Sequence, residues 1–87
     1  MPGVTLLPRA AKQLDRLPKP IKVRMIKLLV RLESWPEVSG VKPLSGRLSG
    51  HYRLRTGDYR LQFRVEAGRV LVEQVGHRDG FYERENE

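Results

Sequence analysis

The chain contains no cysteine, no Gly-rich phosphate loop and no apolar run long enough to span a membrane. The missing cysteines exclude disulfide bonds, thiolate catalysis and thiolate metal sites, and they are compatible with a reducing cytosol. The two histidines lack the spacing of a metal site, so we expect neither a metal nor another cofactor. The first residues do not join a basic start to a long apolar stretch, so we expect no signal peptide.

Positive charge is what the sequence has in excess. Lysine and arginine number 17 against 10 aspartate and glutamate residues, a net charge of +7 over 87 residues. The length and the 39% hydrophobic content fit one small domain, residues 1–87, with a modest core. Such an excess favours phosphate-bearing partners, although solubility alone explains it equally well. The positions of the arginines must therefore decide between a phosphate-bearing partner and solubility as the reason for the excess charge.

Prolines and apolar spacing divide the first half of the chain into a strand and two helices. Val4 to Leu7 is a short apolar run that fits a strand at a sheet edge. Pro8 suits the first turn of a helix that ends at Leu17. Pro20 then begins a second helix, which ends at Ser34-Trp35-Pro36.

The second helix carries two apolar stripes. The first stripe consists of Ile21, Met25, Leu28, Leu29 and Leu32. The second stripe consists of Val23, Ile26 and Val30. A helix with two such stripes usually contacts two things. We interpret the second stripe as packing against the first helix, and the alternative is a surface for a protein partner.

Three strands follow a loop rich in glycine and serine over residues 37–50. Apolar and polar residues alternate over His51–Arg55 and again over Asp58–Val65, and Arg69–Gly76 forms the third strand. The order predicts an α+β fold: an N-terminal strand, a two-helix hairpin packed on one face of the sheet, and an antiparallel three-stranded meander.

The first turn of the meander brings arginines together. A turn at Thr56-Gly57 places Arg53 opposite Arg60, whereas a turn at Gly57-Asp58 places Arg55 there. Like charges directly opposite each other cost stability in both registers. We interpret the pair as a site that holds an anion, and for a small basic protein the obvious polyanion is nucleic acid.

Cleavage of RNA needs fixed cations around one phosphate and groups that pass protons. Arginine suits the first task because its planar fork matches phosphate oxygens. His51 and His77 can titrate near neutral pH, although each alone is more often a polar surface residue. Tyr82, four residues after Arg78, can orient the substrate or transfer a proton.

Three segments, VKPLSGRLSGHYRLR, GDYRLQFRV and VEQVGHRDGFY, together resemble the RelE/ParE superfamily of bacterial toxins from type II toxin–antitoxin systems. The resemblance covers nearly the whole chain and implies a RelE-like fold. RelE-like members cut mRNA on the ribosome, whereas ParE-like members share the fold and poison DNA gyrase.

The resemblance also implies roles for single residues. Arg60 would hold the phosphate, Arg78 would stabilise charge and assist the leaving group, and Tyr82 would stack on or orient the substrate. RelE carries lysines where this chain has Arg53 and Arg55, and arginine is a poor general base because it stays protonated. His77 or His51 would then accept the proton. We expect the RNA to be bound by Arg53, Arg55, Lys42, Arg47 and His51.

These observations predict the toxin of a toxin–antitoxin pair: a cytoplasmic, metal-independent mRNA endoribonuclease that acts in the ribosomal A site. Its partners would be a cognate antitoxin, the ribosome and mRNA, and it would be a monomer or part of a hetero-oligomer with the antitoxin. The alternative is a ParE-like toxin that poisons gyrase without cutting RNA. A non-catalytic RNA-binding module needs only the charge and is the third interpretation.

Overall fold

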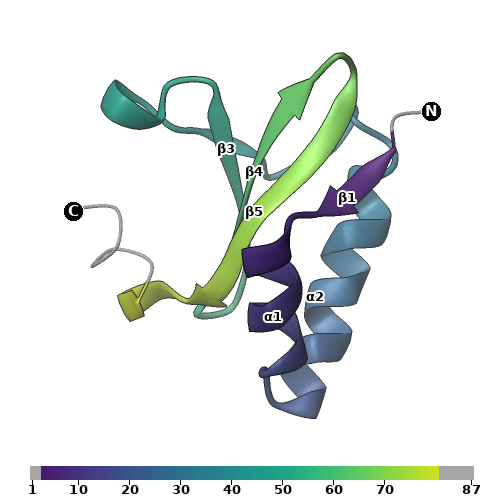
Figure 1. Ribbon diagram of the computed structural model, residues 1–87, viewed down its shortest axis with the longest axis vertical. Helices are drawn as coiled ribbons and strands as arrows, with labels where there is room; N and C mark the ends of the chain where they lie inside the picture. Colours follow the sequence, from purple (N-terminus) through teal and green to yellow (C-terminus); the bar gives the residue numbers. More distant parts are fainter. Residues whose placement is uncertain (1–2, 81–87) are drawn as a thin grey trace.

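The computed structural model of the protein describes residues 3–80, which form one five-stranded sheet with two helices against it (Figure 1). The helical elements are α1 (Pro8–Asp15), α2 (Lys19–Leu32) and the short 3₁₀ helix η1 (Gly46–Leu48). The strands are β1 (Val4–Leu6), β2 (Lys42–Pro43), β3 (His51–Thr56), β4 (Tyr59–Glu66) and β5 (Arg69–His77). They lie in the order β1-β5-β4-β3-β2.

The predicted α+β arrangement is confirmed, with one strand more than the sequence indicated. β1 lies at an edge and pairs parallel with β5, and β3, β4 and β5 form the antiparallel meander. The additional strand is β2, in which Lys42 and Pro43 pair with Arg53 and Tyr52. A strand of two residues in a loop rich in glycine, serine and proline carries no alternation, so its sequence gives no strand signal.

The meander adopts the second of the two predicted registers. The β3–β4 turn is Gly57-Asp58, so Arg55 lies directly opposite Arg60. Gly57 has a φ of 60°, a conformation that glycine adopts without steric cost at the first central position of a type II′ turn.

A bulge in β5 changes which side chains face the core. Phe63 is paired with Val72 and Gln62 with Gln74, so Glu73 is an extra residue between two paired ones. The bulge shifts the alternation of β5 side chains between the two faces of the sheet. Glu73 and Gln74 therefore stay outside the apolar core, and the next core residue is Val75, which is 1% exposed.

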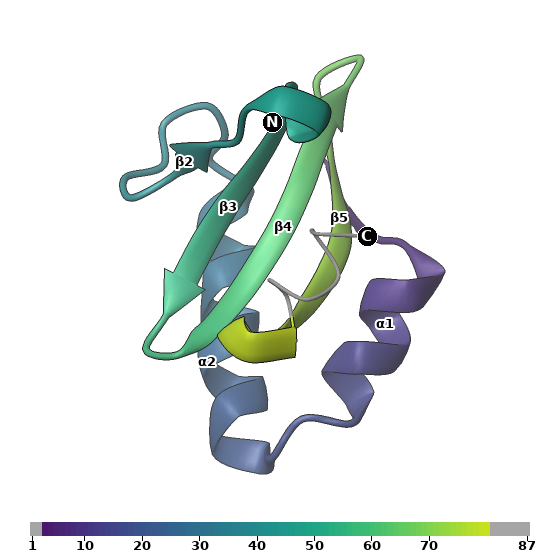
Figure 2. The same cartoon turned by 90° about the vertical axis from the view of Figure 1, so that its left-hand side faces the viewer.

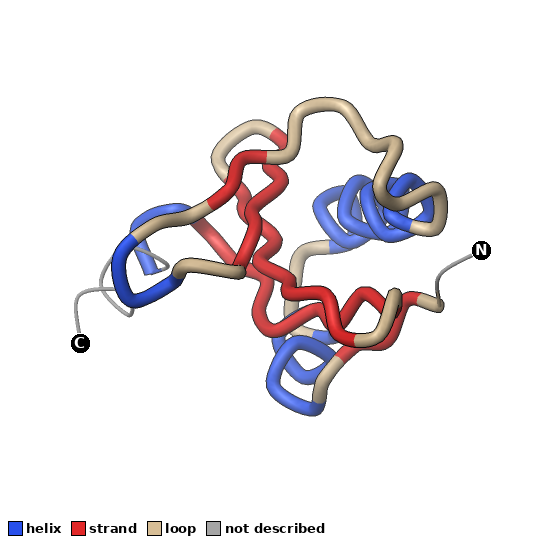
Figure 3. Tube along the Cα trace, turned by 90° about the horizontal axis from the view of Figure 1, so that it is seen from above, coloured by secondary structure: helices blue, strands red, loops and turns tan. Residues whose placement is uncertain are grey.

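The core lies between the sheet and the two long helices. Figure 2 shows the open face of the sheet, with α2 behind β3 and β4 and α1 beside β5, and Figure 3 shows the two long helices and the strands from above. The buried core residues are Ala10, Met25, Leu28, Leu32, Leu54, Leu61, Phe63, Val70, Val72 and Val75. The predicted helical hairpin therefore packs on one face and leaves the polar face of the sheet open.

The second apolar stripe of α2 does not pack against α1, so that interpretation was wrong. Val23, Ile26 and Val30 are 50%, 46% and 59% exposed. At 3.6 residues per turn, the stripe lies roughly 150° around the helix from the buried one, so a helix seated on the core cannot cover both. Within residues 3–80, neither long helix has the length and apolar character needed to cross a membrane.

Candidate functional site

The centre of the candidate site is the arginine pair at the turn end of β3 and β4. Arg60 is 5% exposed, and its Nη1 donates to the carbonyl oxygen of Gly57 at 3.2 Å. Its Nε is buried and has no hydrogen-bond partner within the described residues. Arg55, directly across the strand pair, is exposed. A buried guanidinium with an unpaired N–H beside a second cation is suited to an anion, because an unmatched buried donor costs free energy.

Arg78 follows β5 and is held at the same turn. Its backbone N–H donates to the carbonyl oxygen of Asp58 at 2.8 Å. Its Nε lies 4.0 Å from the Asp58 carboxylate and 3.7 Å from that of Asp79. Both carboxylates are largely exposed, so these ion pairs are weak and an incoming phosphate can compete with them. The fold thus places Arg55, Arg60 and Arg78 around one end of the sheet.

His77, the last residue of β5, lies at this end too. Its ring meets that of Tyr59 edge-on, with 5.2 Å between the centroids. The backbone N–H of Asp79 donates to its Nδ1 at 3.3 Å. The same Nδ1 also lies 3.5 Å from a carboxylate oxygen of Asp79.

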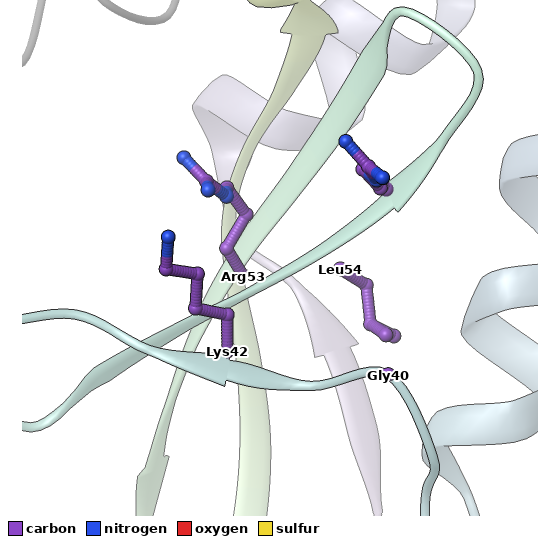
Figure 4. A pocket seen from close by; sticks show the side chains of 5 residues that line it. Gly40, Lys42, Arg53 and Leu54 are labelled. Carbon is purple, nitrogen blue, oxygen red and sulfur yellow. The ribbon is translucent and has the colours of Figure 1, made fainter.

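A second group of cations lies where β2 meets β3. Lys42 is paired directly opposite Arg53, and Figure 4 shows both side chains extending to the same side of the strands while Leu54 points the other way. A pocket of about 320 Å³ is lined by Gly40, Lys42, Arg53, Leu54 and Arg55. Arg47 belongs to η1, beyond β2 in the chain, and does not line this pocket.

The middle of the open face holds a carboxylate, Glu73, whose central position the sequence did not reveal. One of its oxygens lies 2.6 Å from Nδ1 of His51 and accepts from Gln62 at 3.1 Å, and the other accepts from Arg64 at 3.0 Å. Burial alone would raise the pKa of Glu73, but hydrogen bonds from His51, Gln62 and Arg64 hold that pKa below its ordinary value. Glu73 is therefore ionised at neutral pH.

Further polar contacts extend this network toward both sides of the sheet. The amide of Gln74 donates to Gln62 at 3.1 Å and accepts from Arg9 of α1 at 3.1 Å. Arg64 also pairs with the exposed Glu66 at 2.8 Å. Hydrogen bonds first to Glu66 and then to Glu73 raise the pKa of the Arg64 guanidinium above its ordinary value.

The predicted site residues thus separate into groups along the sheet, and His77, which pairs with Tyr59, lies on the face of the sheet opposite Arg60. Arg55, Arg60, His77 and Arg78 meet at the turn end, Lys42 and Arg53 meet beside β2, and His51 joins the Glu73 network. Tyr82 lies outside the described residues. The interacting residues that sequence reasoning left without a role are Arg9, Gln62, Gln74 and Asp79.

One signal in the sequence could have located the Glu73 network, although the sequence analysis did not use it. The core residues Val70, Val72 and Val75 are spaced by two and then by three, and this change of period marks the bulge that brings Glu73 and Gln74 to the polar face. Bulges are common beside active sites because they re-aim a side chain.

Comparisons with known proteins agree with this geometry. The family model described as the ParE toxin of the type II toxin–antitoxin system parDE matches residues 4–80. No curated protein sequence matches the chain.

Solved structures of toxins share the fold. The RelBE2 toxin–antitoxin complex from Mycobacterium tuberculosis is 28% identical with a TM-score of 0.75, over 87% of this chain and 90% of that chain. The archaeal RelE–RelB complex from Pyrococcus horikoshii is 28% identical with a TM-score of 0.72, over 88% and 94%. The isolated RelE toxin of E. coli is 20% identical with a TM-score of 0.75, over 99% and 97%, and at that identity it shows the fold alone.

The match to the family model over most of the chain and the shared fold lead to the same conclusion. The chain belongs to the ParE toxin family, within the RelE/ParE superfamily of type II toxin–antitoxin toxins.

Proposed function

We propose that this toxin is an mRNA endoribonuclease that needs no metal and acts on mRNA in the ribosomal A site, in the cytoplasm. The observation that carries the proposal is Arg60, a buried guanidinium whose Nε has no partner in the described part of the chain and which faces Arg55. Two cations held together without a buried carboxylate between them favour a phosphate as the missing anion.

Each cation at the turn end has a distinct task in this proposal. Arg60 holds the scissile phosphate, and Arg78 stabilises the negative charge that grows on it in the transition state. Tyr82, outside the described residues, would stack on or orient the substrate. Lys42, Arg53 and Arg47 would bind flanking phosphates and thereby position the strand.

The test is induced expression followed by mapping of RNA ends and of DNA damage. A ribosome-directed nuclease halts translation and leaves mRNA cut within codons. Growth arrest with intact mRNA would contradict the proposal.

A gyrase poison is the second candidate, because the matching family model is that of the ParE toxins and because Arg53 and Arg55 cannot serve as proton acceptors. In this case the basic face would contact protein or DNA and no RNA bond would be cut. Expression would then trigger DNA damage signals while translation initially continues.

The partner we propose is a cognate antitoxin that binds the second apolar stripe of α2. A groove of about 230 Å³ runs beside this stripe and is lined by Val4, Leu6, Ile26, Leu29, Val30 and Glu33. The M. tuberculosis and P. horikoshii relatives were solved as complexes with their antitoxins. An apolar segment of the antitoxin seated here would cover side chains that the toxin alone leaves in water.

A further inference from the structure

The positive charge of the protein is divided unevenly between the helices and the sheet. Residues 8–33, which hold α1 and α2, contain eight lysine and arginine residues and two acidic residues, so they account for +6 of the net charge of +7. Among the described residues, the cations of this segment form one ion pair, between Lys22 and Asp15 at 3.9 Å. On the sheet, Arg64 and Arg78 each lie near two carboxylates. The unneutralised charge is therefore on the helices and not at the proposed cleavage site.

Three of these cations form one row along α1. Arg9, Lys12 and Arg16 stand at i, i+3 and i+7, which places them on one side of the helix over a rise of about 10 Å. All three residues are exposed. Together with Pro8 and Gln13 they line a hollow of about 400 Å³. Arg9, Lys12 and Arg16 are the α1 row.

The α1 row faces the edge of the sheet and turns away from α2. Nη2 of Arg9 donates to the side chain of Gln74 on β5 at 3.1 Å, and the side chain of Gln13 accepts from a backbone N–H of the same strand at 2.9 Å. The other side of α1 carries Asp15, which reaches Lys22 of α2. Figure 2 shows α1 beside β5 at the edge of the open face. The row is thus held in place and lies apart from the apolar groove proposed for the antitoxin.

The α1 row destabilises the helix that carries it. Arg9 lies in the first turn, where the positive end of the helix dipole disfavours a cation, and that turn contains no acidic residue. Lys12 is three residues from Arg9 and four from Arg16, and like charges at these spacings repel each other along a helix. Departures from local stability are expected where residues serve function. An anion bound along the row would remove the repulsion.

We infer that the α1 row binds the phosphate backbone of double-stranded RNA, at a surface separate from the arginine pair. Residues 8–33 contain no aromatic residue, so they offer no platform on which unpaired bases could stack. A duplex keeps its bases stacked inside and presents phosphates and ribose hydroxyls at its surface. A straight row of cations on a fixed helix matches such a rigid backbone. The choice of RNA over DNA rests on the proposed function.

An acidic protein partner and a merely solvated surface are the competing explanations. Protein interfaces are built around an apolar centre, and the large apolar residues that the described part of the chain exposes are Val23, Ile26 and Val30, all on α2. The α1 row therefore lacks what a protein partner needs. A row that served only solubility would be equivalent to any other set of exposed cations. The experiment compares two such sets.

The test measures the affinity of the full-length toxin for a blunt RNA duplex of about 16 base pairs at several salt concentrations. Lys12→Gln/Arg16→Gln should weaken binding roughly fiftyfold at about 0.1 M salt and lower the salt slope by about two, because each phosphate contact contributes a slope of about 0.9. The matched control is Lys27→Gln/Arg69→Gln, which removes the same charge from exposed positions outside the row. The control should change the affinity and the slope far less.

Melting temperatures distinguish docking from a structural role. Lys12→Gln/Arg16→Gln should melt no lower than wild type, because the substitutions relieve repulsion within α1. Lys12→Arg/Arg16→Lys keeps both charges and should retain duplex binding. A marked fall in the melting temperature of the Gln variant would assign the two side chains to the fold and overturn the inference.

The remaining outcomes separate this inference from the proposed function. Unchanged duplex affinity in folded Lys12→Gln/Arg16→Gln, or an equal loss in the matched control, would overturn the inference. Tighter binding of the single strand, or of a DNA duplex of the same sequence, would overturn it as well. Duplex binding requires no cleavage, so Arg78→Ala should retain it. A wild-type toxin that binds the duplex through the α1 row but cuts no mRNA would support this inference and overturn the nuclease proposal.

Discussion

The open face of the sheet and the outer face of α2 are both exposed, but they differ in every chemical respect. The sheet face gathers Arg55, Arg60 and Arg78 at one end, where the buried Arg60 guanidinium has an unpaired donor among the described residues. The α2 face presents Val23, Ile26 and Val30 to water beside an apolar groove. Repulsion between like charges destabilises the sheet face, and apolar side chains exposed to water destabilise the α2 face. A different partner relieves each of these penalties when it binds. The molecule thus separates its proposed chemistry from its proposed neutralisation.

Arg78→Ala should abolish the proposed activity of the sheet face and leave antitoxin binding by the α2 face unchanged. Loss of a preorganised donor to a phosphate under attack typically lowers the rate about a hundredfold to a thousandfold, so growth inhibition should vanish. The Arg78 side chain is half exposed, so the variant should fold and bind antitoxin normally. Arg69→Ala removes the same charge from the far end of β5 and should remain toxic. Full cleavage by folded Arg78→Ala would contradict the proposed mechanism.

Salt should distinguish the two faces in the wild-type protein. If about four cations contact phosphates of a single strand, RNA affinity should fall roughly fiftyfold between about 50 and 200 mM salt. Association through the apolar stripe of α2 should change far less, because burial of apolar surface is not screened. Titrations of both partners at several salt concentrations measure the contrast. RNA binding that is weak at low salt, or that ignores salt, would remove the electrostatic argument for the sheet face.

Ile26→Glu should weaken antitoxin binding by the α2 face and leave the activity of the sheet face unchanged. A charge in the centre of an apolar contact should weaken the antitoxin complex about tenfold or more, which corresponds to roughly 1.4 kcal/mol per factor of ten. Ile26 is 46% exposed, so the free toxin should remain folded and toxic. Lys27→Gln, at the neighbouring exposed position, makes the same change of net charge and is the matched control. If Ile26→Glu unfolds the free toxin while the folded Lys27 control binds the antitoxin normally, the stripe is part of the core and not an interface.

Glu73 should link stability to acid pH. Its folded-state pKa is lowered, so its contribution to stability is complete above the unfolded value, about 4.3, and is lost as pH falls through the folded value. The melting temperature of wild type should exceed that of Glu73→Gln by several degrees at neutral pH, for a loss of about 1 kcal/mol. That difference should shrink as pH falls below about 4. A difference that is independent of pH would mean that the Glu73 charge does not matter.

Local patterns in the sequence predicted most of the fold but not the details that assemble the site. Alternation and proline positions gave the strands, both helices and the direction of the meander, because these depend on neighbouring residues. The two-residue turn allowed two registers, and only the complete structure shows that Arg55, rather than Arg53, lies opposite Arg60. The short strand β2 depends on pairing with Arg53, a contact that no local pattern encodes.

The Glu73 network was harder to predict because its members are distant in the chain. His51, Gln62 and Glu73 come from three strands, and the bulge that turns Glu73 toward the others shifts the alternation by one residue. Arg64, on the strand next to Glu73, pairs with it at 3.0 Å, and this partner too is distant from Glu73 in the chain. The exposure of Ile26 could not be derived from the helix alone, since both stripes of α2 are apolar in sequence and only the packing decides which one is buried.

The most direct test of the account is cleavage of mRNA by the purified toxin on programmed ribosomes, with a ribose or a single 2′-deoxyribose at the scissile nucleotide. The account predicts a cut within the A-site codon of the all-ribose mRNA, with a 2′,3′-cyclic phosphate end, and no cut in the deoxy-substituted mRNA. Intact all-ribose mRNA under these conditions, together with growth arrest in cells, would contradict the proposal that the arginine face is the active site of a ribonuclease.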